Sequence, residues 1–455
     1  MSFKHVSQTM VEIMKSRFIL LLTAVFLSLS AQSFSQTGPA DSLTVNEAVR
    51  MVLSTNPAVQ QAAEQVSASQ AGVKVSKSPL YPEGGVSLNY ARIGPIPAFS
   101  FPGFGNIVLA PANNYDEHIG LSGTVYDFNR RQKSVDLAET QVQSSKDRLE
   151  LVRQDLAYRT IQTFYAVLFL QRSIRVQDDA INTLNEHISM TKKKVEAGTA
   201  TDFDVLTTQV RVAAAQDEKI NLENSLSNTE IVLRRLLGYS QDSPLNLAGE
   251  FNETPLSLNT DSLTGIAMEN RVELKSANDE IATAQARYNM ASAADNPSLN
   301  VAFAWGFKNG YEPNLNAWRG NFAAAAQLQI PISGVVPFFG GYSKQSMEEE
   351  AGASMKAAES YKSNVVQEVK ADVQRGIVDL RSSLEKLRTS DITVQQADSA
   401  LSIARIRYEA GTVTNLDLLD AETALAQARL MRLQALYKYV IGRYEVQQAI
   451  GDKTW

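Results

Sequence analysis

The chain contains no cysteine and only three histidines among its 455 residues. The absence of cysteine excludes a disulfide framework, a thiolate metal site and a thiol nucleophile. It also removes the residue that an N-terminal lipid anchor requires, so no lipid anchor is expected. The histidines, His5, His118 and His187, lie far apart in the sequence, which argues against a histidine-rich metal site. We therefore expect no metal and no other cofactor.

Catalytic signatures are equally scarce. The sequence has no glycine-rich phosphate loop, no HExxH segment and no nucleophile elbow. Acid pairs such as Asp178-Asp179 fall in helical patterns and are expected to be surface charge. The net charge of −6 makes the chain a poor candidate for binding nucleic acid. We therefore expect a protein that is not an enzyme and does not bind nucleic acid.

Long apolar runs are confined to the N-terminal region. Phe18–Ser30 is an apolar run of thirteen residues that follows Lys15 and Arg17 and precedes the small residues of Ala31-Gln-Ser33. A membrane-spanning helix needs about 20 residues, so residues 1–33 are interpreted as a cleaved signal peptide, with a signal anchor as the alternative. No later run approaches this length. A membrane role would therefore depend on β-strands.

One structural unit occurs twice in the chain. The segment Glu196–Leu206 (EAGTATDFDVL) recurs as Glu409–Leu419 (EAGTVTNLDLL), 213 residues later and with seven of eleven positions identical. Leu237-Gly238 and Ile450-Gly451 keep the same separation. These matches predict a tandem duplication, with a first repeat over residues 34–250 and a second over 251–455.

Proline placement indicates where long helices can run. No proline lies between Pro111 and Pro244, and none follows Pro337. Both windows show apolar residues at alternating spacings of three and four, as in Leu184, Ile188, Thr191 and Val195. We predict helical hairpins over 129–237 and 341–450, with glycine turns at Gly198 and Gly411. The helix 129–197 would be about 100 Å long at 1.5 Å per residue.

The segments rich in proline and glycine alternate with a period of two residues. They predict strands at about 84–94, 117–127, 298–308 and 321–332, one pair before each hairpin and each pair preceded by a helix. Gly94–Asn114 is predicted to be a long extracellular loop. Apolar and aromatic residues on one face, with small and polar residues on the other, fit a strand between lipid and water. A half-buried sheet in a soluble α+β protein fits the same pattern.

Four strands cannot close a membrane barrel, which needs at least about eight. Two copies of the chain would supply eight strands, and three would supply twelve. Because an eight-stranded barrel is filled by its own side chains, a conducting duct favours three copies. The sequence thus predicts an α+β membrane protein with long α-helical hairpins and a shared barrel. A secreted coiled-coil scaffold without a pore is the alternative, but it leaves the paired strands unexplained.

The segment Tyr408–Glu422 (YEAGTVTNLDLLDAE), its parallel in the first half and the order of elements carry a resemblance to a known family. The chain resembles the outer membrane efflux proteins, the TolC-like exit ducts of Gram-negative bacteria. The resemblance implies a homotrimer with a twelve-stranded barrel in the outer-membrane lipid and a helical tunnel in the periplasm. It implies passive export for an inner-membrane pump of RND, ABC or MFS type, through a periplasmic adaptor, in drug efflux or in type I protein secretion.

The resemblance also implies roles for single residues. Asp417 and Asp420 fall at the positions that form acidic rings at the narrowest point of the tunnel. The alternative for both is a surface charge or a carboxylate favoured by a helix N-terminus. Tyr408 and Asp204 fall at a pair that holds the closed tip by hydrogen bonding. An arginine that latches some members would fall at Val413.

Four further residues are expected to dock the adaptor. They lie at the two hairpin tips: Gly198, Thr199, Gly411 and Thr412. Simple helix capping by the glycines is compatible with this role. The two halves differ near the tips, because Tyr408 and Asp420 correspond to Val195 and Thr207 in the first half. This asymmetry is where we expect the gate.

Overall fold

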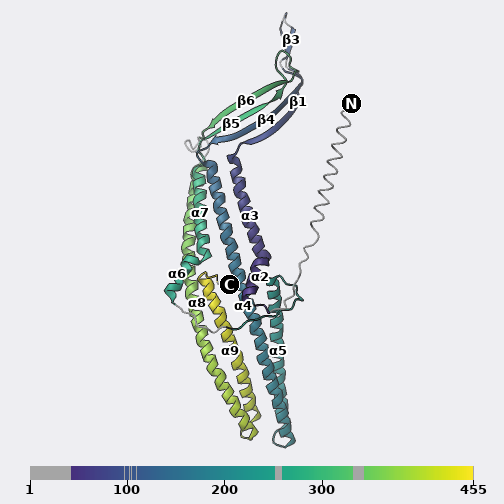
Figure 1. The fold of residues 1–455 in the computed structure, drawn as a ribbon, viewed down its shortest axis with the longest axis vertical. Helices are drawn as coiled ribbons and strands as arrows, with labels where there is room; N and C mark the ends of the chain where they lie inside the picture. The colour runs from purple at the N-terminus through teal and green to yellow at the C-terminus, as the bar shows by residue number, and fades with distance from the viewer. Residues whose placement is uncertain are drawn as a thin grey trace, which may run out of the picture.

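The computed structural model describes residues 42–251, 259–331 and 343–453, apart from residues 97, 102, 104 and 109. The predicted signal peptide lies outside these residues. The molecule is elongated, with a β-sheet at one end and the tips of two helical hairpins at the other (Figure 1). Among the helices described in these ranges, none is long and apolar enough to cross a membrane.

Two helices, two strands of the main sheet and a long helical hairpin follow one another in the same order in both halves. In the first half the order is α2 (Val45–Thr55), α3 (Pro57–Lys77), η1 (Ser78–Leu80), β1 (Glu83–Arg92), β2 (Ala98–Phe101), β3 (Gly105–Val108), β4 (Asn113–Tyr126), α4 (Arg130–Glu196) and α5 (Asp202–Leu237). In the second half it is α6 (Thr260–Asn270), α7 (Val272–Ser292), β5 (Ser298–Lys308), β6 (Arg319–Gln329), α8 (Ser343–Glu409) and α9 (Asn415–Ala449). The long helices α4 and α8 both have 67 residues, and the return helices α5 and α9 have 36 and 35.

The helix that opens each half is split into two pieces. Asn56 adopts an extended conformation between α2 and α3, and its side-chain oxygen accepts a hydrogen bond from the Ala58 N–H at 2.9 Å. Pro57 follows as the first residue of α3, where its missing N–H costs nothing. Arg271 separates α6 from α7 at the corresponding place.

The four main strands form one antiparallel sheet in the order β1-β4-β5-β6. The pairing of β4 with β5 joins the two halves, and β1 and β6 are the edges of this sheet. The strand β5 coincides with the predicted 298–308. The strand β4 begins at Asn113, four residues earlier than predicted, because its polar start continues the ladder with the end of β1.

The register places residues of one kind in rows across the sheet. Val86, Ile119, Trp305 and Phe322 are direct neighbours on the four strands, and all four are exposed in the single chain. The next row, on the opposite face, is Ser87, His118, Gly306 and Asn321. In that row His118 Nε2 lies 3.1 Å from Asn321 Oδ1. One face of the sheet is therefore apolar, and the other is polar with small residues.

The predicted loop 94–114 contains a further hairpin, β2 paired with β3. Sequence reasoning missed it because its strands are only four residues long and lie among prolines and glycines. Gly103 lies in the turn between them with φ of +91°, a backbone conformation that side chains disfavour.

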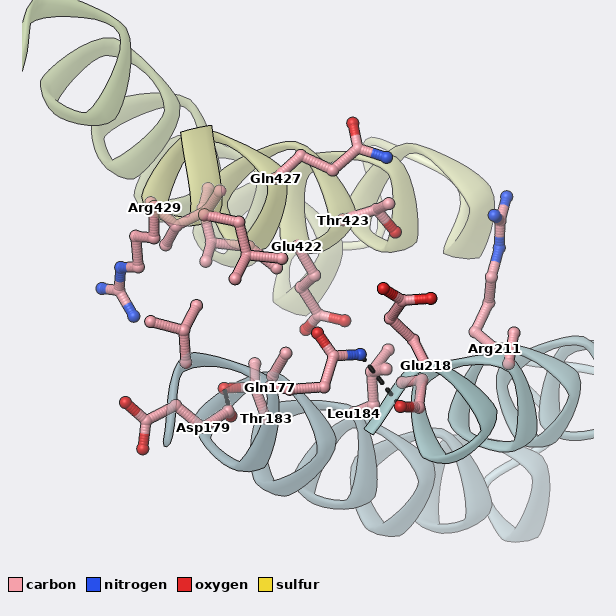
Figure 2. A pocket seen from close by; sticks show the side chains of 18 residues that line it. Gln177, Asp179, Thr183, Leu184, Arg211, Glu218, Glu422, Thr423, Gln427 and Arg429 are labelled. Carbon is pink, nitrogen blue, oxygen red and sulfur yellow. Dashed lines mark hydrogen bonds between the residues drawn. The ribbon is translucent and has the colours of Figure 1, made fainter. Parts of the chain in front are cut away.

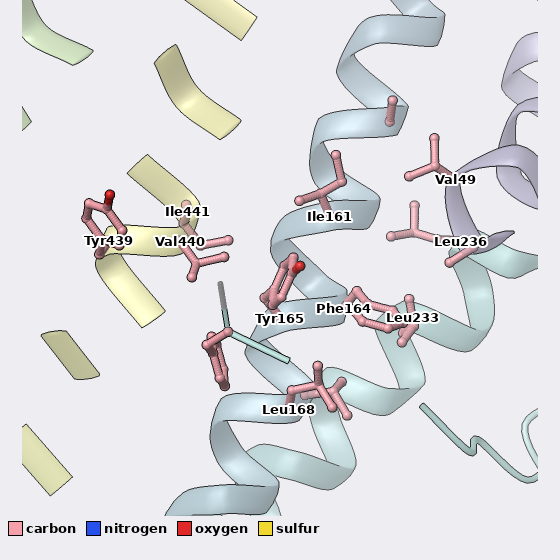
Figure 3. Packing of buried hydrophobic residues seen from close by; sticks show 14 of the residues in the cluster. Val49, Ile161, Phe164, Tyr165, Leu168, Leu233, Leu236, Tyr439, Val440 and Ile441 are labelled. Atoms are coloured by element: carbon pink, nitrogen blue, oxygen red, sulfur yellow. The ribbon is translucent and has the colours of Figure 1, made fainter. Parts of the chain in front are cut away.

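The largest core lies midway along the helices, where α2, α4, α5 and α9 meet (Figure 3). Phe164 and Ile161 of α4 pack here with Leu233 of α5, Val49 of α2 and Val440 of α9, and all five are almost completely buried. Each such side chain contributes about 1.5–3 kcal/mol through burial. This core fixes the middle of the two hairpins and leaves their tips to be held by other contacts.

Candidate gate at the hairpin tips

The two tip turns have the same backbone geometry. Gly198 and Gly411 both have φ of +72°. The Thr199 N–H donates to Lys194 O at 2.8 Å, and the Thr412 N–H donates to Arg407 O at 2.9 Å. These are the six-residue bonds of a Schellman motif, in which glycine takes the left-handed position. The tip glycines therefore cap α4 and α8.

The return helices also begin alike. Thr201 caps α5 and Thr414 caps α9, each in a capping box with the acid three residues later. Asp417 Oδ2 accepts from the Thr414 N–H at 2.8 Å and from the Thr414 hydroxyl at 2.7 Å. Asp204 Oδ2 makes the same two bonds with Thr201, at 2.9 and 2.8 Å. Both acids thus stabilise helix N-termini.

The hydrogen bonds from Thr414, first from its side chain and then from its backbone, lower the pKa of Asp417. Asp417 therefore stays ionised and exposed at the tip. Asp420 lies one turn further along α9, also exposed, with the guanidinium of Arg211 from α5 at 3.4 Å from its carboxylate. The structure thus places the two predicted gate acids within one turn of each other at the start of α9.

Tyr408 is buried between the hairpins. Its hydroxyl lies 3.3 Å from Thr191 Oγ1 and donates to Asn415 Oδ1 at 3.3 Å. Lys194 Nζ donates to the Tyr408 carbonyl at 2.5 Å and lies 4.4 Å from the centre of its ring. Burial raises the pKa of Tyr408, so its hydroxyl keeps its proton at neutral pH. Within one chain, Tyr408 reaches the Asp204 backbone through Asn415.

Sequence reasoning missed three residues of this cluster: His187, Asn415 and Glu422. His187 lies between the other two and is 1% exposed. Its spacing is the signal that could have revealed it. Leu184, His187 and Thr191 also follow one another at spacings of three and four, and all three are buried, whereas the apolar pattern predicted Ile188 at the position of His187. Its partners could not be found this way, because Glu422 is 235 residues distant.

A groove of about 410 Å³ lies beside this cluster, between α4, α5 and α9 (Figure 2). Its walls include the apolar side chains of Leu184, Leu425 and Leu430, and Arg211 and Glu218 also line it. Figure 2 shows Glu422 projecting from α9 toward α4 and α5. In the part of the chain that the structure describes, no three or more His, Asp or Glu side chains converge as a metal site would require.

A four-stranded sheet continued by two long helical hairpins is the fold of outer-membrane channel subunits. The outer-membrane channel OprN has this fold with a TM-score of 0.75 at 18% identity, covering 90% of both chains. The outer membrane protein VceC of Vibrio cholerae gives a TM-score of 0.76 at 16% identity, covering 90% of this chain and 97% of its own.

The chain belongs to the outer membrane efflux protein family, whose sequence model matches residues 48–239 and 263–452. It is similar to the outer membrane protein TolC of Vibrio cholerae, at 25% identity over 70% of this chain and 72% of the relative. It is also similar to the alkaline protease secretion protein AprF of Pseudomonas aeruginosa, at 26% identity over 72% and 68% of the two chains. The family expected from Tyr408–Glu422 is thereby confirmed.

Proposed function

We propose that the chain is one subunit of an outer-membrane exit duct, which conducts cargo handed over by an inner-membrane pump and a periplasmic adaptor. The observation that carries the proposal is the sheet, whose apolar face is exposed and whose helices extend far to one side. A soluble sheet would bury the row of Val86, Ile119, Trp305 and Phe322, whereas lipid can cover it.

Aromatic side chains at both ends of the sheet support its placement in a membrane. Tyr115 lies 5.2 Å from Tyr90 and 5.4 Å from Trp318, between ring centres, at the end away from the helices. Tyr126 and Phe128 are 4.7 Å apart at the other end. Such rings favour the two interfaces between lipid and water. The helical hairpins then extend into the periplasm of a Gram-negative cell, to which the signal peptide 1–33 directs the chain.

The open edges of the chain support a homotrimer. The strands β1 and β6 end the sheet, and in lipid such edges must be paired. The helices α5 and α8 carry exposed apolar residues at heptad spacing: Phe203, Leu206 and Val210 on α5, and Ile392, Ile403 and Ile406 on α8. Pairing β1 with β6 and α5 with α8 of the next copy closes a ring, and three copies give a twelve-stranded barrel with a conducting interior.

Three copies would bring six carboxylates from Asp417 and Asp420 to the tunnel end, where a ring of like charge favours cations. The tip residues Gly198, Thr199, Gly411 and Thr412 would face the adaptor. Tyr408 would hold the closed tip, reaching Asp204 by way of Asn415, and Val413 would add no charged latch. The matching order of elements and the two matches of one family model support the duplication of residues 34–250 as 251–455.

The cargo is set by the pump. Relatives named for cobalt-zinc-cadmium resistance, pyoverdine export and alkaline protease secretion are similar in sequence to this chain. Their breadth supports a duct that conducts many substrates passively, whether in efflux or in type I secretion.

Fractionation combined with planar bilayers tests the proposal. The chain should resist extraction by alkaline carbonate, require detergent for release from outer membranes, migrate as a trimer after cross-linking and form ion-conducting pores. A chain that carbonate removes and that conducts no current would instead be the secreted coiled-coil scaffold.

A further inference from the structure

The side chain of His187 joins the two hairpins near their tips. Its Nδ1 lies 3.0 Å from Glu422 Oε2, and its Nε2 lies 2.9 Å from Asn415 Oδ1. His187 belongs to α4 in the first hairpin, and both partners belong to α9 in the second. The side chains of His187 and Glu422 are only 1% and 4% exposed. A polar contact so well shielded from water is costly unless each group is satisfied.

The surrounding bonds fix which atoms carry hydrogen. Asn415 Nδ2 donates to the backbone carbonyl of Asp204 at 3.2 Å, and a carbonyl can only accept. The amide is therefore oriented with Oδ1 toward His187, and Tyr408 also donates to that oxygen. It follows that His187 Nε2 must carry a hydrogen and donate it to Asn415.

The remaining contact, between His187 Nδ1 and Glu422 Oε2, therefore needs one proton of its own. A neutral imidazole that uses its hydrogen at Nε2 has a lone pair at Nδ1, and an ionised carboxylate also offers only lone pairs. The two atoms bond if the pair holds one further proton, on either partner. Without it, two acceptors would face each other at 3.0 Å in a buried site.

The duplication does not repeat the contact between His187 and Glu422 at the equivalent positions of the other helices. At the separation of 213 residues, His187 corresponds to Ala400, Glu422 to Gln209 and Asn415 to Asp202. The second set cannot rebuild the contact, because it lacks the imidazole. The bond between the hairpins is thus specific to the α4–α9 contact.

We propose that His187 and Glu422 form a proton-dependent link that holds the two hairpin tips together while the pair shares a proton and releases them when a rise in pH removes that proton. The proposal rests on the gating role proposed for the tips. Other charged or titratable groups near the link are Lys194 on α4, Asp204, Arg211 and Glu218 on α5, and Tyr408 on α8. Of these groups, Arg211 pairs with Asp420 and the Asp204 carboxylate accepts from Thr201, so neither side chain contacts the His187–Glu422 pair in these bonds.

The absence of cysteine allows the link to be measured directly by spin labelling. Glu196→Cys and Glu409→Cys place one label at the exposed end of each long helix, and pulsed EPR on full-length protein diluted with unlabelled chain gives the distance within one chain. Between about pH 5 and 9, the population with separated tips should rise with pH. A single proton limits this rise to about tenfold per pH unit.

Two variants in the labelled background separate the proton from the contact. Glu422→Gln supplies an amide hydrogen to Nδ1, so the tips should stay together at every pH. His187→Leu removes both bonds, so the population with separated tips should exceed that of the parent at low pH and should not change with pH. A distance that does not change with pH in the parent, or an unchanged pH response in Glu422→Gln, would overturn the link.

Conductance of the same samples in planar bilayers keeps this test distinct from that of the duct. A pH-dependent distance without conductance would retain the link and contradict the proposed function. Conductance together with a distance that is constant over the pH range would support the duct and contradict the link.

Discussion

Asn415 Nδ2 donates to the backbone carbonyl of Asp204 at 3.2 Å, which ties the first turn of α9 to the first turn of α5. This bond joins two helix starts that occupy equivalent places in the two halves. The side-chain oxygen of Asn415 also accepts from His187 of α4 and Tyr408 of α8. This one amide on α9 therefore bonds to all three of the other tip helices.

Replacing this amide with a carboxylate should open the tip. In Asn415→Asp the donor to Asp204 becomes an acceptor, and the loss of a satisfied buried group costs about 1–3 kcal/mol. Single-channel recordings should show a higher conductance than the parent. Asp202→Asn, the mirror change at the exposed equivalent position, should have no effect, and equal effects of the two would contradict the role of Asn415.

The tip turn should tolerate asparagine better than alanine at Gly411. The φ of +72° disfavours any side chain, and Gly411→Ala should lower stability by about 1 kcal/mol, whereas asparagine enters this region more readily. No atom lies within 4 Å of a Cβ built there, so the cost is conformational alone. Urea unfolding in detergent measures both variants, and equal losses would show that the turn does not constrain the backbone.

The proposed ring of Asp417 and Asp420 carboxylates should set ion selectivity. Asp417→Asn combined with Asp420→Asn removes both carboxylates near the tunnel end, and should reduce both the preference for cations and block by multivalent cations. Reversal potentials across a salt gradient report the change. Asp204→Asn, at the equivalent capping position of α5, is the matched control, and unchanged selectivity in the double variant would exclude the acidic gate.

The seam between the halves of the sheet should not accept a side chain at Gly306. A Cβ there would lie 1.8 Å from the Glu117 carbonyl oxygen and 2.7 Å from His118 Cα, both backbone atoms of β4. Gly306→Ala should therefore abolish assembly of the proposed trimer, as cross-linking in outer membranes would measure. Gly85→Ala on the same face of β1 meets no atom within 4 Å and should assemble normally. Normal assembly of Gly306→Ala would mean that β4 and β5 are not paired as described.

Stability should depend on pH through Asp279 of α7. Burial, with the nearby charge of Asp147, raises the pKa of Asp279 to about 6. The folded chain therefore holds this proton more tightly than the unfolded chain, where the pKa is about 3.9. Its contribution to stability is complete below about pH 4 and is lost as the pH rises to about 6. Asp279→Asn should raise the urea midpoint at pH 8 and leave it unchanged at pH 4.

Periodicity predicted the long elements well, since it reports which face of a segment is covered. The helix α5 ends at Leu237, where the predicted hairpin over 129–237 ends, and β5 matches its alternating pattern. The polar start of β4 escaped prediction because Asn113 and Asp116 are held by the ladder with β1, where apolar alternation has ended. Local patterns cannot show a pairing that depends on a distant strand.

The site was predictable only in part for a similar reason. The glycine turns and capping boxes are local, and their residues follow from spacing. The bonds of His187 depend on two helices that meet far apart in sequence, so a polar residue in the seam was the only available sign. The family pattern drew attention to Tyr408, whereas its partners Thr191 and Asn415 follow from the packing of this chain.

The edges β1 and β6 differ from each other, so each chain must supply one of each to a closed assembly. One chain with a damaged edge would leave its whole assembly open. When damaged and intact chains are expressed together, an assembly closes only if all of its subunits are intact. The yield of closed assemblies should therefore equal the fraction of intact chains raised to a power, and that power is the number of subunits. A simple mixing curve can therefore count the subunits without isolating the complex.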